Sequence, residues 1–261
     1  MGNLIADIFV TIGGNQSPDR VAIINKSLDS LFASTEPGQA RITLCLDGIS
    51  RWATDPIGKI PDADYILSSK ENEGLGPTIN RAVTHIKMIN DWYSHPTHGD
   101  QTKVAPYVCM TQDDVIYTTG WLPKLVGKFR AYGLQYKLGF ASGIESIEHP
   151  IKKDLGGGVI LKDWIRATNM IGERSYWESM MPIPRLDPET RQVRAKPNDG
   201  MGSGVDWHVI RNHENSVCRS GRTCLVMPGL LQHIGFKDST WLQNGREMPE
   251  SESDKEKMKD V

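Results

Sequence analysis

A chain of 261 residues with 38% hydrophobic and 24% charged residues has the composition of an ordinary globular protein. Its formal net charge of −2 excludes the strongly basic classes of nucleic-acid-binding protein. No apolar run approaches the roughly 20 residues of a membrane span, so we expect no membrane association.

The first two thirds of the chain alternate short apolar runs with helical periods, which predicts an α/β fold with a mainly parallel sheet. Strands are expected at residues 8–12, 42–46, 65–67 and 107–110. Helices are expected from Pro18 (behind the capping residue Ser17), from Gly76-Pro77 and from Trp121.

Beyond residue 135 the pattern is mixed. It predicts strands at 138–142, 158–161 and 223–227, and helices at 163–171 and 205–212. Residues 176–204 form a long polar stretch with four prolines, which is longer than a connection needs to be unless it serves function. The charged tail at 245–261 is expected to be disordered.

The cysteines favour a reducing compartment. Cys45 and Cys109 lie within apolar runs and are expected to be buried thiols, and the spacing of Cys218 and Cys224 fits no zinc or redox motif. The N-terminus lacks the basic region of a signal peptide. We therefore expect a cytoplasmic protein.

Polar residues follow the predicted strands at Thr11, Asp47, 70–76 and 112–114. Ligands of open α/β sheets bind beyond the carboxyl ends of the strands, so these segments are expected on one rim. The adjacent carboxylates of Asp113 and Asp114 repel each other unless a cation or hydrogen-bond donors are present. Oxygen ligands suit Mg²⁺ or Mn²⁺ bridging phosphates. The structural alternative is an Asp turn or a helix cap before Trp121.

The order of these segments resembles the nucleotide-sugar half of GT-A glycosyltransferases, family 2 in particular. Asn72, Gly74 and Asn80 match its N-x-G-x-x-x-x-x-N segment, and Gln112-Asp113-Asp114 stands where the family has D-x-D. Three later segments also fit: 156–158, 204–207 and 232–235. The resemblance implies one GT-A domain over 1–244, with the nucleotide-sugar half at about 1–125 and the acceptor half at 126–244.

The resemblance also implies a nucleoside-diphosphate-sugar donor, with a UDP-sugar favoured, and Mn²⁺ or Mg²⁺ as cofactor. Asp114 and His233 would bind the metal. Gln112 replaces the first acid of D-x-D, so it could hydrogen-bond a ribose hydroxyl without adding charge. A shift of one residue would instead put Asp113 on the metal and Thr111 in the first position. The residues implied at the nucleotide are Thr11, Asp47, Asn72, Gly74, Asn80, Gln112 and Asp113.

Asp206 is the expected general base. Inverting transfer needs a carboxylate that takes the acceptor hydroxyl proton. In the family this acid lies at the N-terminus of the helix after the acceptor loop, the place that Asp206 occupies. Asp199 is a rival, and an ordinary helix cap is the structural alternative for Asp206.

The acceptor is predicted from arginines interleaved with aromatic residues, which could follow a nucleic-acid backbone and stack on an extruded base. Such a chain resembles small bacteriophage-type transferases that glycosylate hydroxymethylated pyrimidines in DNA, which would place it in the host cytoplasm. A protein, glycan or small-molecule acceptor, or a catalytically silent nucleotide-sugar binding module, are the alternatives. The residues expected at the acceptor are Gly157, Gly158, Trp177, Arg191, Arg194 and Trp207.

Overall fold

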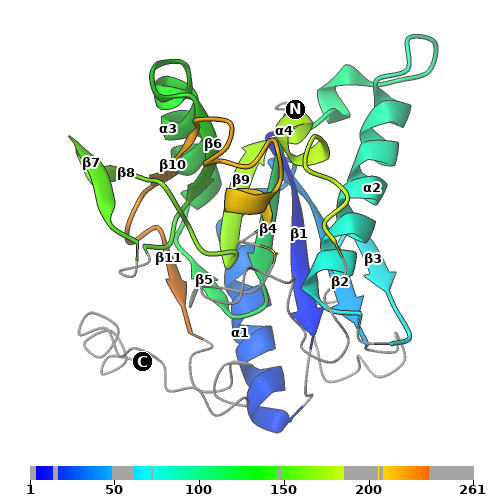
Figure 1. Ribbon diagram of the computed structural model, residues 1–261. Coiled ribbons are helices and arrows are strands. Elements are labelled where there is room, and N and C mark those ends of the chain that lie inside the picture. The colour runs from blue at the N-terminus through cyan, green and yellow to red at the C-terminus, as the bar shows by residue number, and fades with distance from the viewer. Residues whose placement is uncertain are drawn as a thin grey trace.

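The computed structural model describes residues 4–13, 17–48, 62–71, 73–145, 149–184, 205 and 208–234. Its centre is a nine-stranded mixed sheet in the order β3-β2-β1-β4-β9-β6-β10-β8-β7 (Figure 1). The strands are β1 (Ala6–Gly13), β2 (Ala40–Asp47), β3 (Tyr65–Ser68), β4 (Tyr107–Gln112), β6 (Leu138–Ser142), β7 (Ile151–Gly156), β8 (Val159–Lys162), β9 (Asn169–Glu173) and β10 (Thr223–Val226).

One half of this sheet is parallel. Strands β3, β2, β1 and β4 run in the same direction. Strand β9 is antiparallel to both β4 and β6, and β8 is antiparallel to β10 and β7, while β6 and β10 are parallel to each other. The α/β prediction is confirmed, and its parallel part is the part nearest the N-terminus.

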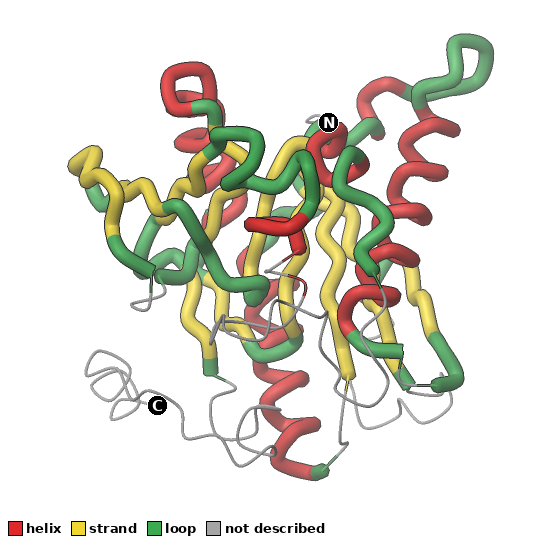
Figure 2. The backbone as a smooth tube through the Cα atoms, in the orientation of Figure 1, coloured by secondary structure: helices red, strands yellow, loops and turns green. Residues whose placement is uncertain are grey.

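Helices cover both faces of the sheet (Figure 2). The longer ones are α1 (Pro18–Ser34), α2 (Leu75–Tyr93) and α3 (Trp121–Tyr136). Shorter ones are η3 (Gln101–Lys103), α4 (Arg174–Glu178) and the π-helical turn η4 (His208–Asn212). Helix α1 begins as predicted, because the Ser17 hydroxyl accepts a hydrogen bond from the Arg20 amide and Pro18 occupies the first turn.

The core has two buried clusters, one on each face of the sheet. One contains the apolar faces of α1 and α3, and the other contains those of α2, α4 and η4. Apolar residues spaced three or four apart place one face of each helix on the sheet, and burial of that face stabilises the helix.

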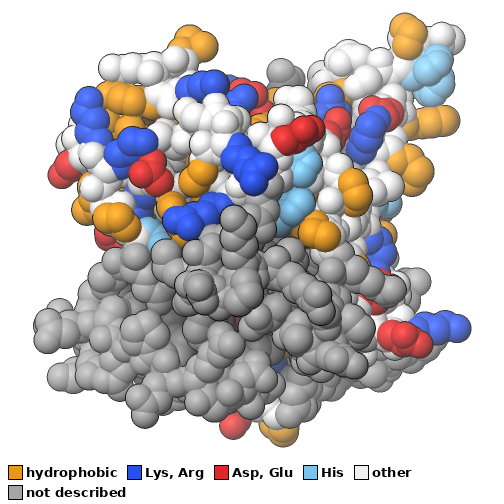
Figure 3. Space-filling model, viewed as in Figure 1, with side chains coloured by type: hydrophobic (Ala, Val, Ile, Leu, Met, Phe, Trp, Pro, Cys, Tyr) orange, Lys and Arg blue, Asp and Glu red, His pale blue; other side chains and the backbone are white. Residues whose placement is uncertain are grey.

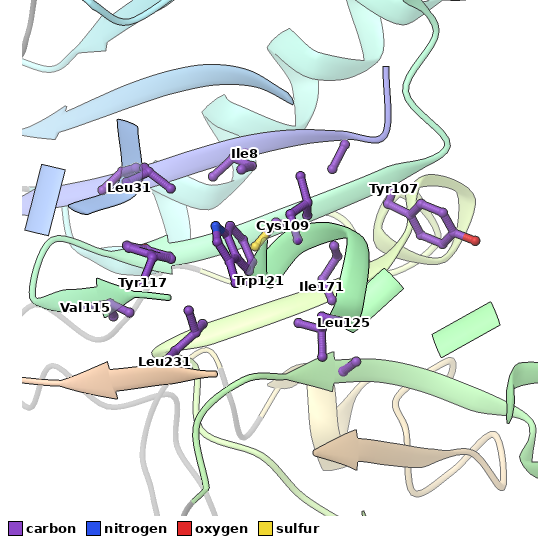
Figure 4. Close-up of a cluster of buried hydrophobic side chains, with 14 of the residues drawn as sticks. Ile8, Leu31, Tyr107, Cys109, Val115, Tyr117, Trp121, Leu125, Ile171 and Leu231 are labelled. Carbon is purple, nitrogen blue, oxygen red and sulfur yellow. The ribbon is translucent and has the colours of Figure 1, made fainter. Parts of the chain in front are cut away.

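A separate two-stranded sheet pairs β5 (Val115–Tyr117) with β11 (Leu231–His233). It is fixed to the main core by its own side chains. Val115, Tyr117 and Leu231 are buried in the same cluster as Trp121, with the Tyr117 ring centroid 5.1 Å from that of Trp121 (Figure 4). These buried contacts therefore fix the turn before β5 and the end of β11 relative to each other.

Two local predictions are wrong. Residues 163–171 are not a helix, because Asn169–Glu173 forms β9 and pairs with β4. The first part of the stretch 176–204 is not a polar loop either, since Tyr176 and Trp177 are buried in α4. In both places tertiary packing overrides the local pattern. The predicted tail at 245–261 lies outside the described residues.

Candidate functional site

Asp113 and Asp114 form the tight turn between β4 and β5. These two residues are only 2% and 6% exposed, respectively. The turn lies at the carboxyl end of β4, beside the ends of β1 and β2, which is the edge where ligands of open α/β sheets bind. Two adjacent buried carboxylates need a positive neighbour to be ionised together.

His233 is brought to this turn by strand pairing. In the β5–β11 ladder His233 lies opposite Val115, and the Ile234 amide donates a 2.9 Å hydrogen bond to the Asp114 carbonyl oxygen. His233 Nε2 then lies 3.2 Å from Asp114 Oδ1. The structure thus places together the two residues that the sequence analysis assigned to one metal.

Arg20 is the positive neighbour of the acid turn, and the sequence analysis missed it. From the first turn of α1, its NH2 group pairs with Asp113 Oδ1 and its NH1 group lies 3.4 Å from Asp114 Oδ2. A cation in the first turn of a helix is disfavoured by the helix dipole. An arginine three residues after a capping serine was therefore a signal that the sequence offered.

The electrostatics separate the two carboxyl groups. Burial, opposed by Arg20 and reinforced by Asp114, raises the pKa of Asp113 to about 7. Burial also acts to raise the pKa of Asp114, but contact with His233 and the charge of Arg20 outweigh it, so the pKa of Asp114 is lowered. Asp114 is therefore ionised at neutral pH, whereas Asp113, with a pKa of about 7, is divided between its protonated and ionised forms.

The residues at this turn fit a divalent cation. Asp113 Oδ2 and Asp114 Oδ1 are buried and accept no hydrogen bond of regular geometry from the described residues. Two neighbouring ligands at roughly 2.1 Å from an octahedral metal lie about 3 Å apart, close to the separation of Asp114 Oδ1 and His233 Nε2.

Within the described ranges, no group of three or more His, Cys, Asp and Glu side chains has the arrangement of a metal site. A cation here would therefore complete its coordination with substrate phosphates and water, as Mg²⁺ commonly does.

Asp47 organises the loop that leads into α2. Its Oδ1 accepts hydrogen bonds from the Glu73 amide at 2.8 Å and the Ser69 hydroxyl at 3.1 Å, and its Oδ2 accepts one from the Gly74 amide at 2.8 Å. Gly74 has φ +86°, a conformation that favours glycine. Asp47 and Gly74 thus form one unit at the rim, and their contact with a nucleotide remains a prediction.

Asn80 fixes another part of the chain. Its Nδ2 donates to the Ile183 carbonyl oxygen at 2.8 Å, and its Oδ1 accepts from the Ile183 amide at 2.7 Å. Beside it, a Cβ added at Gly76 would lie 3.1 Å from the Pro184 carbonyl oxygen. Asn80 therefore holds the Ile183 segment against α2, a structural role that the sequence analysis did not expect.

Thr11 and Gln112 are neighbours in the β1–β4 ladder. The Thr11 hydroxyl donates to the Thr111 carbonyl oxygen at 3.4 Å, and the Gln112 amide donates to the Thr168 carbonyl oxygen at 3.0 Å. Both residues lie at the rim as expected, and their roles at the nucleotide stay predictions.

Of the residues predicted to bind the acceptor, Gly157 and Gly158 form the turn of the β7–β8 hairpin, with φ +59° and +73°. Strand β7 is parallel to β10 and β6, so this turn emerges at the same edge of the sheet as the ends of β1 and β4.

The acceptor role predicted for Trp177 is wrong. This residue has 0% exposure, and its indole N–H donates to the Val108 carbonyl oxygen at 3.0 Å. A side chain with no exposed surface cannot stack on a ligand, so Trp177 is a core residue. Five other predicted site residues lie outside the described residues: Asn72, Arg191, Arg194, Asp206 and Trp207.

Comparisons with known proteins bear on the fold. No protein-family model matches the chain, and no curated protein matches it in sequence. The crystal structure of GalNAc-T7 with UDP, GalNAc and Mn²⁺ superposes with a TM-score of 0.52 at 11% identity. The fold is similar to that of GT-A glycosyltransferases.

The similarity extends over most of this chain but over less than half of each of the other proteins. The GT-A match covers 89% of this chain but 44% of GalNAc-T7. The crystal structure of S. aureus TarS gives a TM-score of 0.48 at 9% identity, and this match covers 87% of this chain and 35% of TarS. The chain thus spans less than half of the length of either protein. In the described part of the chain, no helix has the length and apolar character needed to cross a bilayer.

Proposed function

We propose that the protein is a glycosyltransferase that moves a sugar from a nucleoside-diphosphate sugar, preferably a UDP-sugar, to an acceptor hydroxyl. The observation that carries this proposal is the pairing of Asp114 with His233 in a buried acidic turn at the rim of a GT-A-like sheet. The presence of UDP, GalNAc and Mn²⁺ in the similar GalNAc-T7 structure supports it. In this proposal the nucleotide-sugar half spans about 1–125 and the acceptor half 126–244.

Asp114 and His233 would hold Mn²⁺ or Mg²⁺. A bound cation of this kind would neutralise charge that develops on the departing diphosphate. Arg20 keeps the Asp114 carboxylate oriented by its contact with Oδ2, which leaves Oδ1 directed to His233. Asp47 orders residues 73–74 by accepting their amide hydrogens, so the nucleotide would meet a preformed loop.

Asp206 is the proposed general base, and its action would give inversion at the anomeric carbon. It would accept the proton of the acceptor hydroxyl as that oxygen attacks. Its neighbour Val205 is buried in the same cluster as Ile183 and Trp177, on the face of the sheet that carries α2.

We propose DNA with hydroxymethylated pyrimidines as the acceptor. Lys and Arg side chains lie among Asp and Glu side chains on the face of the molecule that carries β7 and β8 (Figure 3), and Lys152 and Lys153 are exposed on the edge strand β7. Such cations suit a phosphate backbone. Part of this charge is balanced, since Lys152 pairs with Asp163 at 2.6 Å. A salt-sensitive contact through few phosphates is therefore expected.

The donor is tested by calorimetric titration with UDP and other nucleoside diphosphates, with and without Mn²⁺. We expect binding to at least one nucleotide that strengthens with Mn²⁺. Asp114→Asn should lose the metal-dependent part, whereas the matched control Asp100→Asn, at the opposite end of the sheet, should keep it. No metal-dependent binding of any nucleotide by the natural chain would refute the proposal.

The acceptor is tested by incubating the chain with Mn²⁺, a panel of nucleotide sugars and DNA that contains hydroxymethylcytosine or hydroxymethyluracil. Mass analysis of the digested nucleosides should show a gain of one sugar, with unmodified DNA as the control. Release of nucleotide from the donor without a gain in DNA would point to a protein, glycan or small-molecule acceptor. Binding of donor without any release would identify a silent binding module, the alternative suggested by Gln112 in place of an acid.

A further inference from the structure

We propose that Arg20 is a built-in counter-cation that occupies the acidic turn until the donor arrives, and so makes divalent-metal binding depend on the donor's diphosphate. This inference rests on the proposed function, because it concerns the same site. It assigns to Arg20 a positioning and coupling role that neither the sequence motifs nor the fold gives it.

The first argument is the geometry of the contact. The guanidinium takes one oxygen from each carboxylate, Oδ1 of Asp113 and Oδ2 of Asp114. Of the other two oxygens, Asp114 Oδ1 lies 3.2 Å from His233 Nε2, and Asp113 Oδ2 is buried and accepts no hydrogen bond from the described residues. Arg20 and a metal would therefore contact the same two carboxylates, so the arginine does more than lie near the candidate metal site.

The second argument is charge. Arg20 places a fixed positive charge against the two carboxylates, and its side chain is only 15% exposed, so solvent screens it weakly. A divalent cation entering this space meets repulsion from Arg20 as well as attraction from the acids. The chain without donor should therefore bind metal less tightly than the two acids alone would.

The third argument is the place of Arg20 in the fold. Helix α1 begins at Pro18, beyond the carboxyl end of β1, at the edge of the sheet where ligands bind. A guanidinium matches phosphate oxygens with two parallel hydrogen bonds. A diphosphate at this edge would attract Arg20, offset its repulsion of the metal and supply further metal ligands. Metal and diphosphate would then bind with positive coupling, which is reciprocal for the two ligands.

A purely structural role for Arg20 makes a different prediction. If the arginine only compensates buried acids, its removal lowers the free energy of unfolding and disturbs the turn, and metal binding weakens. If it competes with the metal, its removal strengthens metal binding in the absence of donor. The sign of the change in Mn²⁺ affinity separates the two.

The experiment measures Mn²⁺ affinity from the electron paramagnetic resonance signal of free Mn²⁺, with and without saturating UDP. For the natural chain we expect UDP to raise Mn²⁺ affinity. For Arg20→Gln we expect Mn²⁺ affinity without UDP to exceed that of the natural chain by about 10-fold, within the usual range of coupling between two sites, and a smaller effect of UDP. The matched control Lys26→Gln removes an exposed cation from the same helix and should leave both affinities unchanged.

An Arg20→Gln affinity for Mn²⁺ equal to or weaker than that of the natural chain overturns the inference. Should Arg20→Gln fail to fold, Arg20→Met decides. Methionine fills similar space without a charge, so Mn²⁺ should bind more tightly than to the natural chain, and an unchanged or weaker affinity overturns the inference. If the natural chain binds no Mn²⁺ even with UDP, the proposed function fails, whereas Mn²⁺ binding that Arg20 does not modulate refutes the coupling role alone.

Discussion

His233 Nε2 lies 3.2 Å from Asp114 Oδ1, although the two residues come from distant parts of the chain. The contact depends on the pairing of β5 with β11, which aligns Val115 with His233. It also depends on the buried side chains that fix this small sheet to the core. The candidate metal pair is therefore held by rigid elements rather than by a loop.

Loss of either member of this pair should have nearly the same effect. We expect Asp114→Asn and His233→Gln each to weaken Mn²⁺-dependent UDP binding by about 10- to 100-fold or more, the scale on which even outer-shell partners of metals act. The double variant should be little worse than the stronger single one, because both changes remove the same site. Calorimetry on the natural chain, the two single variants and the double variant gives a double-mutant cycle. Fully additive losses of binding free energy would contradict a shared metal.

Asp206→Asn should separate turnover from binding. An amide cannot accept the acceptor proton, so we expect turnover to fall by roughly 10²- to 10⁴-fold with unchanged UDP affinity. Asp199→Asn is the matched comparison in the same part of the sequence and should keep near-normal turnover. The reverse pattern would move the base to Asp199.

Asn80→Ala should destabilise the protein. It leaves the amide and carbonyl of Ile183 without their side-chain partners, and a buried unsatisfied polar group costs about 1–3 kcal/mol. Urea unfolding measures the change. Asn80→Asp keeps the acceptor for the Ile183 amide but sets a carboxylate oxygen against the Ile183 carbonyl oxygen, so it should also be less stable than the natural chain. Equal stability of all three proteins would contradict this role of Asn80.

His208 should make stability depend on pH between about 5 and 7. Burial, together with the charge of His213, lowers the pKa of His208 below its ordinary value of 6.5. The unfolded chain then binds the proton more readily, so the contribution of His208 is complete above pH 6.5 and is lost as pH falls through the lowered pKa.

Thermal unfolding across this range tests the effect. The fall in melting temperature toward pH 5 should be smaller in His208→Gln than in the natural chain. The exposed His98 provides the control, because His98→Gln should leave the slope unchanged. An identical slope in all three proteins would argue against a buried, neutral His208.

The sequence by itself determined those helices and strands whose apolar residues follow a local pattern. The apolar spacing of α1 and α2 and the runs of β1, β2 and β4 are local patterns, and the structure has each of them close to the expected bounds. The acidic turn at Asp113 and Asp114 could be found in the same way, because it directly follows a buried strand.

The family resemblance implied that His233 joins Asp114 on one metal, but only the tertiary structure showed how His233 reaches that turn and that Arg20 contacts both acids. The contacts of Arg20 and His233 with the acids, and of Asn80 with Ile183, depend on the order in which strands and helices pack, and no local pattern encodes that order. The same packing buries Trp177, which a local view places on a polar loop. Secondary structure follows from interactions between near neighbours in the chain, whereas a site is made of side chains that become neighbours only when the sheet is assembled.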